Sequence, residues 1–149
     1  MEIESAFSLI AARKKAREIA LQVLYQKDIT KEPIETVWKV FCEHHQPPAI
    51  ALDYAWYLVK GVNEYLSYID VLIEKYTIRW SIERISLIER NILRLAVYEM
   101  FYIEDVPPKV SINEAIELAK KYGTKTSASF INGVLDAIFH KELIKRSEK

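Results

Sequence analysis

Apolar positions recur along this chain at the spacing of amphipathic helices, in blocks that prolines separate. Proline interrupts a helix interior but is tolerated in loops and at helix starts, so Pro33, Pro47-Pro48 and Pro107-Pro108 mark boundaries. From about Ala12 to Lys27, five apolar residues share one arc when positions are set 100° apart, which predicts a helix that buries this arc. These residues are Ala16, Ile19, Ala20, Val23 and Leu24.

Two further amphipathic helices are predicted around the second proline break. The first begins near Pro33, and the second follows Pro47-Pro48. Helical spacing predicts their buried faces, which are Val37, Val40 and Phe41 in the first helix and Leu52, Ala55, Trp56 and Val59 in the second.

Serines followed three residues later by an acid predict three more helix starts. In such a capping box the serine hydroxyl accepts a hydrogen bond from an otherwise unpaired N–H group of the first turn. The pairs are Ser67 with Asp70, Ser86 with Glu89, and Ser111 with Glu114.

The second half of the chain contains the most apolar predicted helix. From Leu87 to Ile103 apolar residues occupy nearly the whole helical wheel, which predicts a central helix packed on several sides. Gly123 is predicted to end the following helix. The last helix, from about Ser127, is predicted to bury Ile131, Val134, Leu135 and Ile138.

Composition argues against an all-β fold, in agreement with the helical blocks. Three glycines and five prolines are too few to turn the many short strands of a sandwich or barrel. We therefore predict a single compact helical domain over residues 1–149, with about seven helices. The lone Cys42 cannot form an internal disulfide. No apolar run approaches the ~18 residues of a membrane span, so we expect a cytoplasmic protein that contacts no membrane.

Residues that could carry catalysis or hold a metal are not arranged for either purpose. His44 and His45 are adjacent, His140 is distant, and no Cys-x-x-Cys pair is present. The three glycines are scattered, and no serine or cysteine sits in a nucleophile motif. We expect no enzyme activity, no cofactor and no metal.

A basic arc on the first helix is the clearest candidate for binding. The chain carries 21 basic and 21 acidic residues, so an attraction to nucleic acid must come from a local patch. Arg13, Lys14, Lys15 and Arg17 lie near a helix start, where cations oppose the macrodipole. Arg13 and Arg17 flank the boundary of the buried arc, and their long stems can extend outward. An ordinary solvated face explains the same pattern.

Two aromatic residues extend the candidate surface. Tyr25 falls in the middle of the exposed arc, where its ring could stack an unpaired base while the cations hold phosphates. An edge of the core would place it there equally well. Phe130 falls off the buried stripe of the last helix, which fits either a contact surface or packing against a neighbouring helix.

Three blocks together resemble the bacterial transcription antitermination factor NusB family. The first is RKKAREIALQVLYQ at residues 13–26. The second comprises Arg79-Trp80, ERNILRLAVYE at residues 89–99 and DVPPKVSINEA at residues 105–115, continuing to Lys120. The third is SFINGVLD at residues 129–136.

The resemblance implies an all-helical protein of two packed subdomains that binds the boxA element of nascent RNA. It implies partnership with a small ribosomal protein, also called NusE, and with elongating RNA polymerase during ribosomal RNA synthesis. By position, it assigns RNA binding to Arg13, Lys14, Lys15, Arg17, Tyr25 and Phe130, and partner binding to Glu89.

The chain departs from the family pattern at several of these places. Two of the first cations are lysines, which lack the planar fork of arginine, and Thr126 stands where many relatives have an acid. A different class of function, a helical scaffold that hides the basic helix in a homodimer, remains an alternative. A hydrolase would require an acid/base pair that the pattern does not show.

Overall fold

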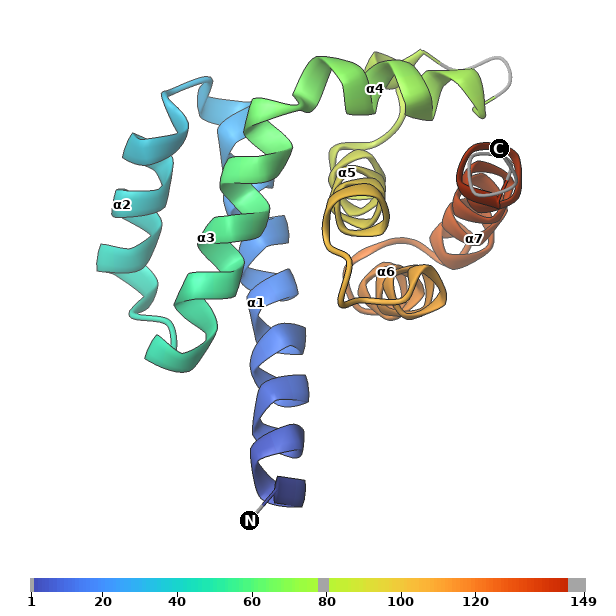
Figure 1. Cartoon of the computed structure of the whole chain (residues 1–149). Helices are drawn as coiled ribbons and strands as arrows, with labels where there is room; N and C mark the ends of the chain where they lie inside the picture. Colours follow the sequence, from blue (N-terminus) through green and yellow to red (C-terminus); the bar gives the residue numbers. More distant parts are fainter. Residues whose placement is uncertain (1, 78–80, 145–149) are drawn as a thin grey trace. The chain divides into compact units, whose positions relative to one another are not determined.

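The structure is a computed structural model that describes residues 2–77 and 81–144, with side chains from residue 8 onward. Within these ranges it contains seven α-helices and no strand, which confirms the all-α prediction. The helices are α1 (Glu2–Thr30), α2 (Ile34–His45), α3 (Ala49–Glu64), α4 (Leu66–Lys75), α5 (Leu87–Tyr102), α6 (Pro108–Tyr122) and α7 (Ser127–Ile138). A 3₁₀ turn (Ile82–Arg84) precedes α5, and a π-helical segment (Phe139–Ile144) follows α7 (Figure 1). Arg79-Trp80 lies outside the described residues.

The chain divides into two compact units at the end of α3. The first comprises residues 1–63 with α1, α2 and α3, and the second comprises residues 64–149 with the remaining helices. Two units match the two subdomains that the family resemblance implied.

In the first unit, α1 buries the arc that its spacing predicted. Ala16, Ile19, Ala20, Val23 and Leu24 are each at most 4% exposed. The helix is longer than predicted in both directions, from Glu2 to Thr30.

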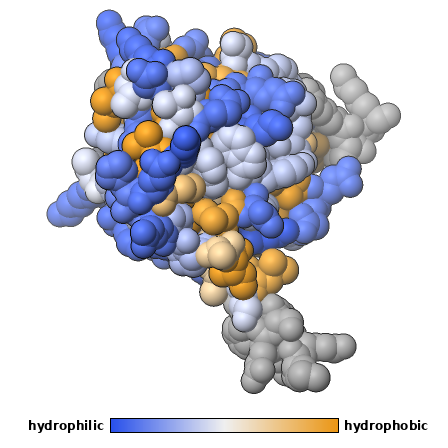
Figure 2. Space-filling model, turned by 90° about the vertical axis from the view of Figure 1, so that its left-hand side faces the viewer, coloured by the Kyte–Doolittle hydropathy of each residue, from blue (hydrophilic) through white to orange (hydrophobic). Residues whose placement is uncertain are grey.

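The predicted faces of α2 and α3 are only partly right. Val40 is 44% exposed, because the buried stripe of α2 follows Ile34, Val37 and Phe41 instead. Trp56 of α3 is half-buried and lies against Trp38 of α2, with 5.1 Å between ring centroids. The face of the first unit shown in Figure 2 is mainly hydrophilic, with small groups of apolar residues.

In the second unit, α5 is the central helix, as predicted. It contacts α4, α6 and α7, and every residue from Asn91 to Met100 is buried. Three of these buried residues are polar or charged, so they require partners inside the unit.

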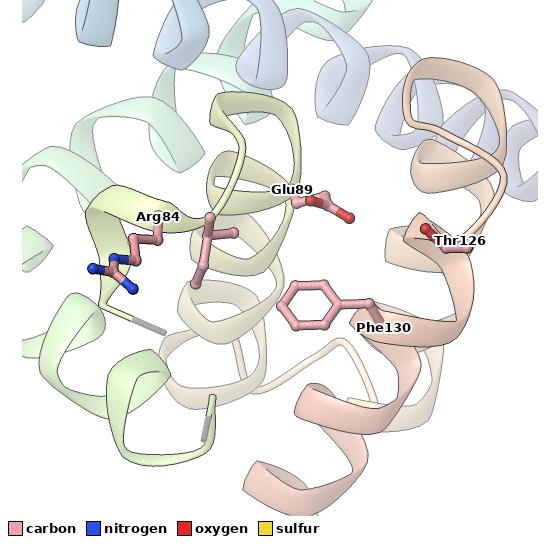
Figure 3. A pocket seen from close by; sticks show the side chains of 5 residues that line it. Arg84, Glu89, Thr126 and Phe130 are labelled. Carbon is pink, nitrogen blue, oxygen red and sulfur yellow. The ribbon is translucent and has the colours of Figure 1, made fainter. Parts of the chain in front are cut away.

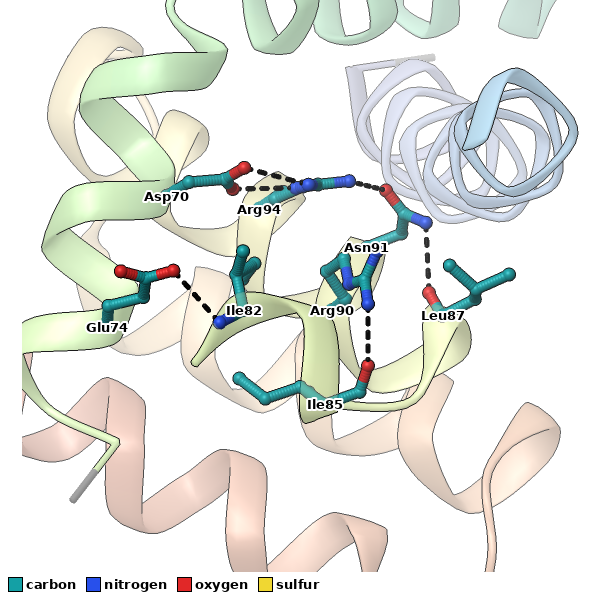
Figure 4. Close-up of polar contacts among 8 residues, drawn as sticks. All are labelled: Asp70, Glu74, Ile82, Ile85, Leu87, Arg90, Asn91 and Arg94. Atoms are coloured by element: carbon teal, nitrogen blue, oxygen red, sulfur yellow. Dashed lines mark hydrogen bonds and ion pairs between the residues drawn. The ribbon is translucent and has the colours of Figure 1, made fainter. Parts of the chain in front are cut away.

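Two of them, Asn91 and Arg94, belong to a polar network beside α5 (Figure 4). Arg94 donates from Nε and Nη2 to the two carboxylate oxygens of Asp70, each at 2.8 Å, and from Nη1 to Asn91 Oδ1 at 3.1 Å. Asn91 in turn donates to the Leu87 carbonyl at 2.9 Å. A two-pronged arginine–carboxylate pair is directional as well as strong, so it ties α4 to α5 in one register.

The three predicted capping boxes have different outcomes. Ser86 caps α5 as expected, because its Oγ accepts from the Glu89 backbone N–H at 3.2 Å. At Ser67 the predicted helix start is right but the predicted cap is wrong: α4 begins at Leu66 without a side-chain cap, and Asp70 pairs with Arg94.

The Ser111 prediction is also wrong, because the double proline itself starts α6. Pro107 is the N-cap residue and Pro108 the first helical residue, a position that suits its fixed φ. Ser111 therefore lies inside the helix, buried, and donates to Glu99 Oε1 at 2.7 Å.

The C-terminal part of the second unit follows the predictions closely. Gly123 ends α6, and α7 buries Ile131, Val134, Leu135 and Ile138. The π-helical segment is joined to the end of α4 through Glu142, which accepts hydrogen bonds from Lys75 and Tyr76. Among the described residues, no helix is both long and apolar enough to cross a bilayer.

Candidate nucleic-acid interface

The basic residues of α1 differ in their access to solvent. Lys14 and Lys15 are exposed, and Arg13 is half-buried. Lys15 forms a long ion pair with Glu18, at 3.8 Å, and an exposed pair of this kind contributes little to stability. The exposure of both lysines agrees with the exposed basic arc predicted for this helix.

Arg17 does not extend outward as expected. It is 7% exposed, whereas Lys14 and Lys15 on the same helix are exposed. A guanidinium so enclosed is poorly placed to reach a phosphate in solution.

A tyrosine of α3 accounts for part of this burial. The guanidinium carbons of Arg13 and Arg17 lie 4.5 Å and 5.8 Å from the centroid of the Tyr54 ring. Both distances fall within the ~6 Å range of cation–π attraction. Tyr54 was not among the residues predicted from the sequence, because nothing local indicates which residue of α3 faces α1.

Tyr25 lies on the same helix as the cations, half-buried rather than in the middle of an exposed face. Eight residues separate it from Arg17, a rise of about 12 Å along an α-helix. Part of the ring remains accessible, so it can offer an edge or one face to a ligand.

In the second unit, Phe130 and Glu89 line a common pocket of about 260 Å³, together with Arg84, Ile85 and Thr126. Figure 3 shows the Phe130 ring projecting from α7 toward α5 and the Glu89 carboxylate pointing toward the α7 side. The Arg84 guanidinium points away from the ring. The volume is below that of typical drug-sized sites, and it suits one planar group.

Glu89 has the capping interaction predicted for it and also lies beside the pocket. Its backbone N–H is the group that Ser86 caps, and its Oε1 accepts from the Ser86 hydroxyl at 2.8 Å. The carboxylate also borders the pocket. Capping therefore fixes this carboxylate in place without closing the pocket.

The structure thus gathers the predicted residues into two groups. Arg13, Lys14, Lys15, Arg17 and Tyr25 share α1 in the first unit, while Glu89 and Phe130 share the pocket of the second. Ile85 and Arg84 were missed because they precede α5 in a short irregular segment without periodicity. Within the described residues, no cluster of three potential metal-ligating side chains occurs.

The sequence pattern of the NusB family matches residues 14–140. The chain belongs to the NusB family.

Relatives and solved structures support this membership. The chain is 42% identical to the transcription antitermination protein NusB of Syntrophus aciditrophicus, over 92% of this chain and 85% of that protein. It is 40% identical to the NusB of Chloroherpeton thalassium, over 89% of this chain but 64% of that longer protein. A crystal structure of the antitermination factors NusB and NusE in complex with double-stranded RNA superimposes with a TM-score of 0.79 and 34% identity, covering 87% of this chain and 97% of that chain.

NusB-family membership agrees with the expectation drawn from the three sequence blocks. The relatives are named as antitermination factors and not as enzymes. The family match begins at Lys14 and ends at His140, so it includes every predicted site residue except Arg13.

Proposed function

We propose that this protein is a cytoplasmic transcription antitermination factor that binds boxA-type single-stranded RNA together with NusE. The complex joins elongating RNA polymerase and supports ribosomal RNA transcription. The observation that carries the proposal is the cation group on α1, with Lys14 and Lys15 exposed and Tyr25 partly accessible on the same helix. The protein has no catalytic role in this process.

In this proposal, cations of α1 contact phosphates and aromatic rings contact bases. Phosphate contacts supply affinity without sequence information, while an aromatic ring can stack any unpaired base. Lys14, Lys15 and Arg13 serve as phosphate contacts, and Tyr25 and Phe130 serve as stacking rings. Phe130 suits this role because its ring lines a pocket of the second unit.

We further propose that Glu89 contributes to the NusE interface. Its carboxylate lines the pocket and is held by Ser86. A carboxylate fixed in this way can accept a hydrogen bond from a cationic partner residue at little entropic cost. The related structure, in which a NusB protein is in complex with NusE and RNA, supports NusE as a partner of this family member.

A salt series tests the phosphate contacts. Fluorescence anisotropy of a labelled boxA single-stranded RNA, with and without NusE, gives the dependence of log K on log salt concentration. Each phosphate contact on a single strand contributes about −0.7 to the slope. Contacts from all four cations therefore predict about −3, and the burial of Arg17 favours about −2, from three.

A double-stranded RNA of the same sequence completes this experiment, because the related complex contains double-stranded RNA. The proposal expects tighter binding of the single strand and a further gain with NusE, since the chain has no net charge to attract RNA by itself. Absence of binding with NusE present would overturn it and favour a self-associating scaffold.

A further inference from the structure

Tyr54 contacts both arginines of the basic helix from a neighbouring helix of the same unit. It lies on α3, its ring is half-buried, and the Arg13 and Arg17 guanidinium carbons lie 4.5 Å and 5.8 Å from the ring centroid. None of the sequence blocks that resemble the family includes it. The contacts join two different helices, so only the tertiary structure reveals them.

The contact relieves a repulsion within α1. Residues four apart lie above one another on one helix face, and like charges at this spacing oppose each other. Arg13 and Arg17 have this spacing. The negative face of an aromatic ring attracts cations, so one ring near both guanidiniums offsets their repulsion.

The choice between arginine and lysine along α1 follows the same contact. The two residues near the ring are arginines, while Lys14 and Lys15 between them are lysines. A guanidinium is planar, weakly hydrated and stacks on aromatic faces, whereas an ammonium is a strongly hydrated point charge. Arginine therefore stands at the positions where stacking is possible.

We propose that Tyr54 is a positioning residue that holds the Arg13 side chain ready for an RNA phosphate. This inference rests on the RNA-binding function proposed above. A long side chain that is ordered before binding loses less conformational freedom when the complex forms. The Tyr54 ring lies against the guanidinium carbon of Arg13, and the planar guanidinium carries several N–H donors that can meet a phosphate.

The two arginines then have different parts. Arg13 is half-buried and is the arginine that contacts RNA in this proposal. Arg17, at 7% exposure, contacts the Tyr54 ring and helps to hold it in place. The proposal therefore couples Tyr54 to Arg13 in RNA binding. It does not require Arg17 to contact RNA.

A double-mutant cycle tests the coupling. The variants are Tyr54→Leu, Tyr54→Phe, Arg13→Gln and the combination of Tyr54→Leu with Arg13→Gln. The probe is a fluorescein-labelled boxA single-stranded RNA of about 12 nucleotides, a length within the usual range of such sites, and the readout is anisotropy across a salt series. Circular dichroism melts confirm that each variant is folded.

We expect Tyr54→Leu to weaken binding about 3- to 30-fold, the range of a lost cation–π contact, and to flatten the salt slope by up to about 0.7. Tyr54→Phe keeps the ring face and should stay within about twofold of the wild type. In the Arg13→Gln background, Tyr54→Leu should cause no further loss. A merely structural tyrosine would shift the melting temperature but leave the salt slope unchanged.

The matched control is Tyr57→Leu, the same substitution at an exposed ring of the same helix, which should leave RNA binding within about twofold. If Tyr54→Leu does not fold, Tyr54→Met replaces it, because methionine fills irregular gaps. Wild-type affinity of the folded variant, or a full loss that persists in the Arg13→Gln background, overturns the inference alone. A wild-type protein that binds no RNA overturns the proposed function itself and the inference with it.

Discussion

Tyr25 is a partly buried aromatic residue of α1. Its neighbours Val23 and Leu24 are buried in the core of the first unit, while the ring itself is half-buried. A ring held on one side by the core loses little freedom when a base stacks on the other side. This residue therefore offers a direct test of base stacking.

We expect Tyr25→Ala to weaken RNA binding by ~1–3 kcal/mol, the usual effect of removing a stacking ring. Tyr25→Phe keeps the ring and should retain most of the affinity. Anisotropy with the boxA RNA measures both, and circular dichroism verifies folding. Unchanged binding by a folded Tyr25→Ala protein would remove Tyr25 from the interface.

Two glycines in the second unit differ in the space around them. A Cβ on Gly133, in the middle of α7, would meet no atom within 4 Å. A Cβ on Gly123, at the end of α6, would lie 2.6 Å from Ser127 Oγ and 2.8 Å from the Ala119 carbonyl oxygen. Gly123 is thus required by a close approach, and Gly133 is not.

We therefore expect opposite effects of the same substitution on the free energy of unfolding. Gly133→Ala should stabilise the protein by about 0.5–1 kcal/mol, because alanine favours a helix interior. Gly123→Ala should destabilise it by ~1–3 kcal/mol through overpacking. Urea unfolding measures both, and a stabilising Gly123→Ala variant would contradict the crowding at the end of α6.

At the scale of elements, Glu142 joins the C-terminal π-helical segment to the end of α4. Glu142 accepts from Lys75 Nζ at 2.8 Å and from the Tyr76 hydroxyl. The hydrogen bond and charge of Glu142 raise the pKa of Lys75 above 10.5. Burial, followed by the hydrogen bond to Glu142, raises the pKa of Tyr76 above 10.0. Both groups thus bind their protons more tightly in the folded protein.

This linkage predicts a loss of stability at alkaline pH. Because the folded state holds more protons, the contribution is present below about pH 10 and declines as the pH rises through the raised pKa values. The melting temperature of the wild type should exceed that of Glu142→Gln at pH 8, and the difference should shrink above pH 10.5.

The control for this prediction is Glu117→Gln. It removes an exposed pair with Lys120, whose atoms are 3.7 Å apart, and such a pair contributes little at any pH. A difference between wild type and Glu142→Gln that stays constant up to pH 11 would contradict the predicted effect of Glu142 on the two pKa values.

At the scale of the whole molecule, charge is balanced but not uniformly placed. Formal charge is zero, so attraction to RNA must depend on where the cations lie rather than on their number. The proposed RNA-binding function and the scaffold alternative predict different surfaces at this scale. A scaffold dimer that hides α1 would bury Lys14 and Lys15, whereas RNA binding requires them to be accessible.

We expect the pair Lys14→Glu and Lys15→Glu to abolish detectable RNA binding while the protein keeps a monomer mass of 17.4 kDa. Light scattering measures the mass, and anisotropy measures binding. The matched control reverses Lys39 and Lys60, two exposed lysines of α2 and α3, and should retain most of the binding. Equal losses in the two pairs would show that only net charge matters, and a dimer mass for the wild type would favour the scaffold.

Local pattern in the sequence determined the helices and most of their buried faces. The apolar arc of α1, the burial of α5 on several sides and the stripe of α7 are all as predicted, because helical periodicity is a property of neighbouring residues. The Ser86 cap is local for the same reason. The prediction that RNA and NusE are binding partners came from the similarity of the three blocks to a known family, and not from periodicity.

Tertiary structure decided which partner each polar residue has. Asp70 pairs with Arg94, 24 residues away, and Ser111 bonds to Glu99 on another helix, so neither caps a helix as its local pattern predicted. Arg17 is buried and contacts Tyr54 for the same reason. A side chain bonds to the group that packing brings closest, and spacing along one helix carries no information about the residues of the next.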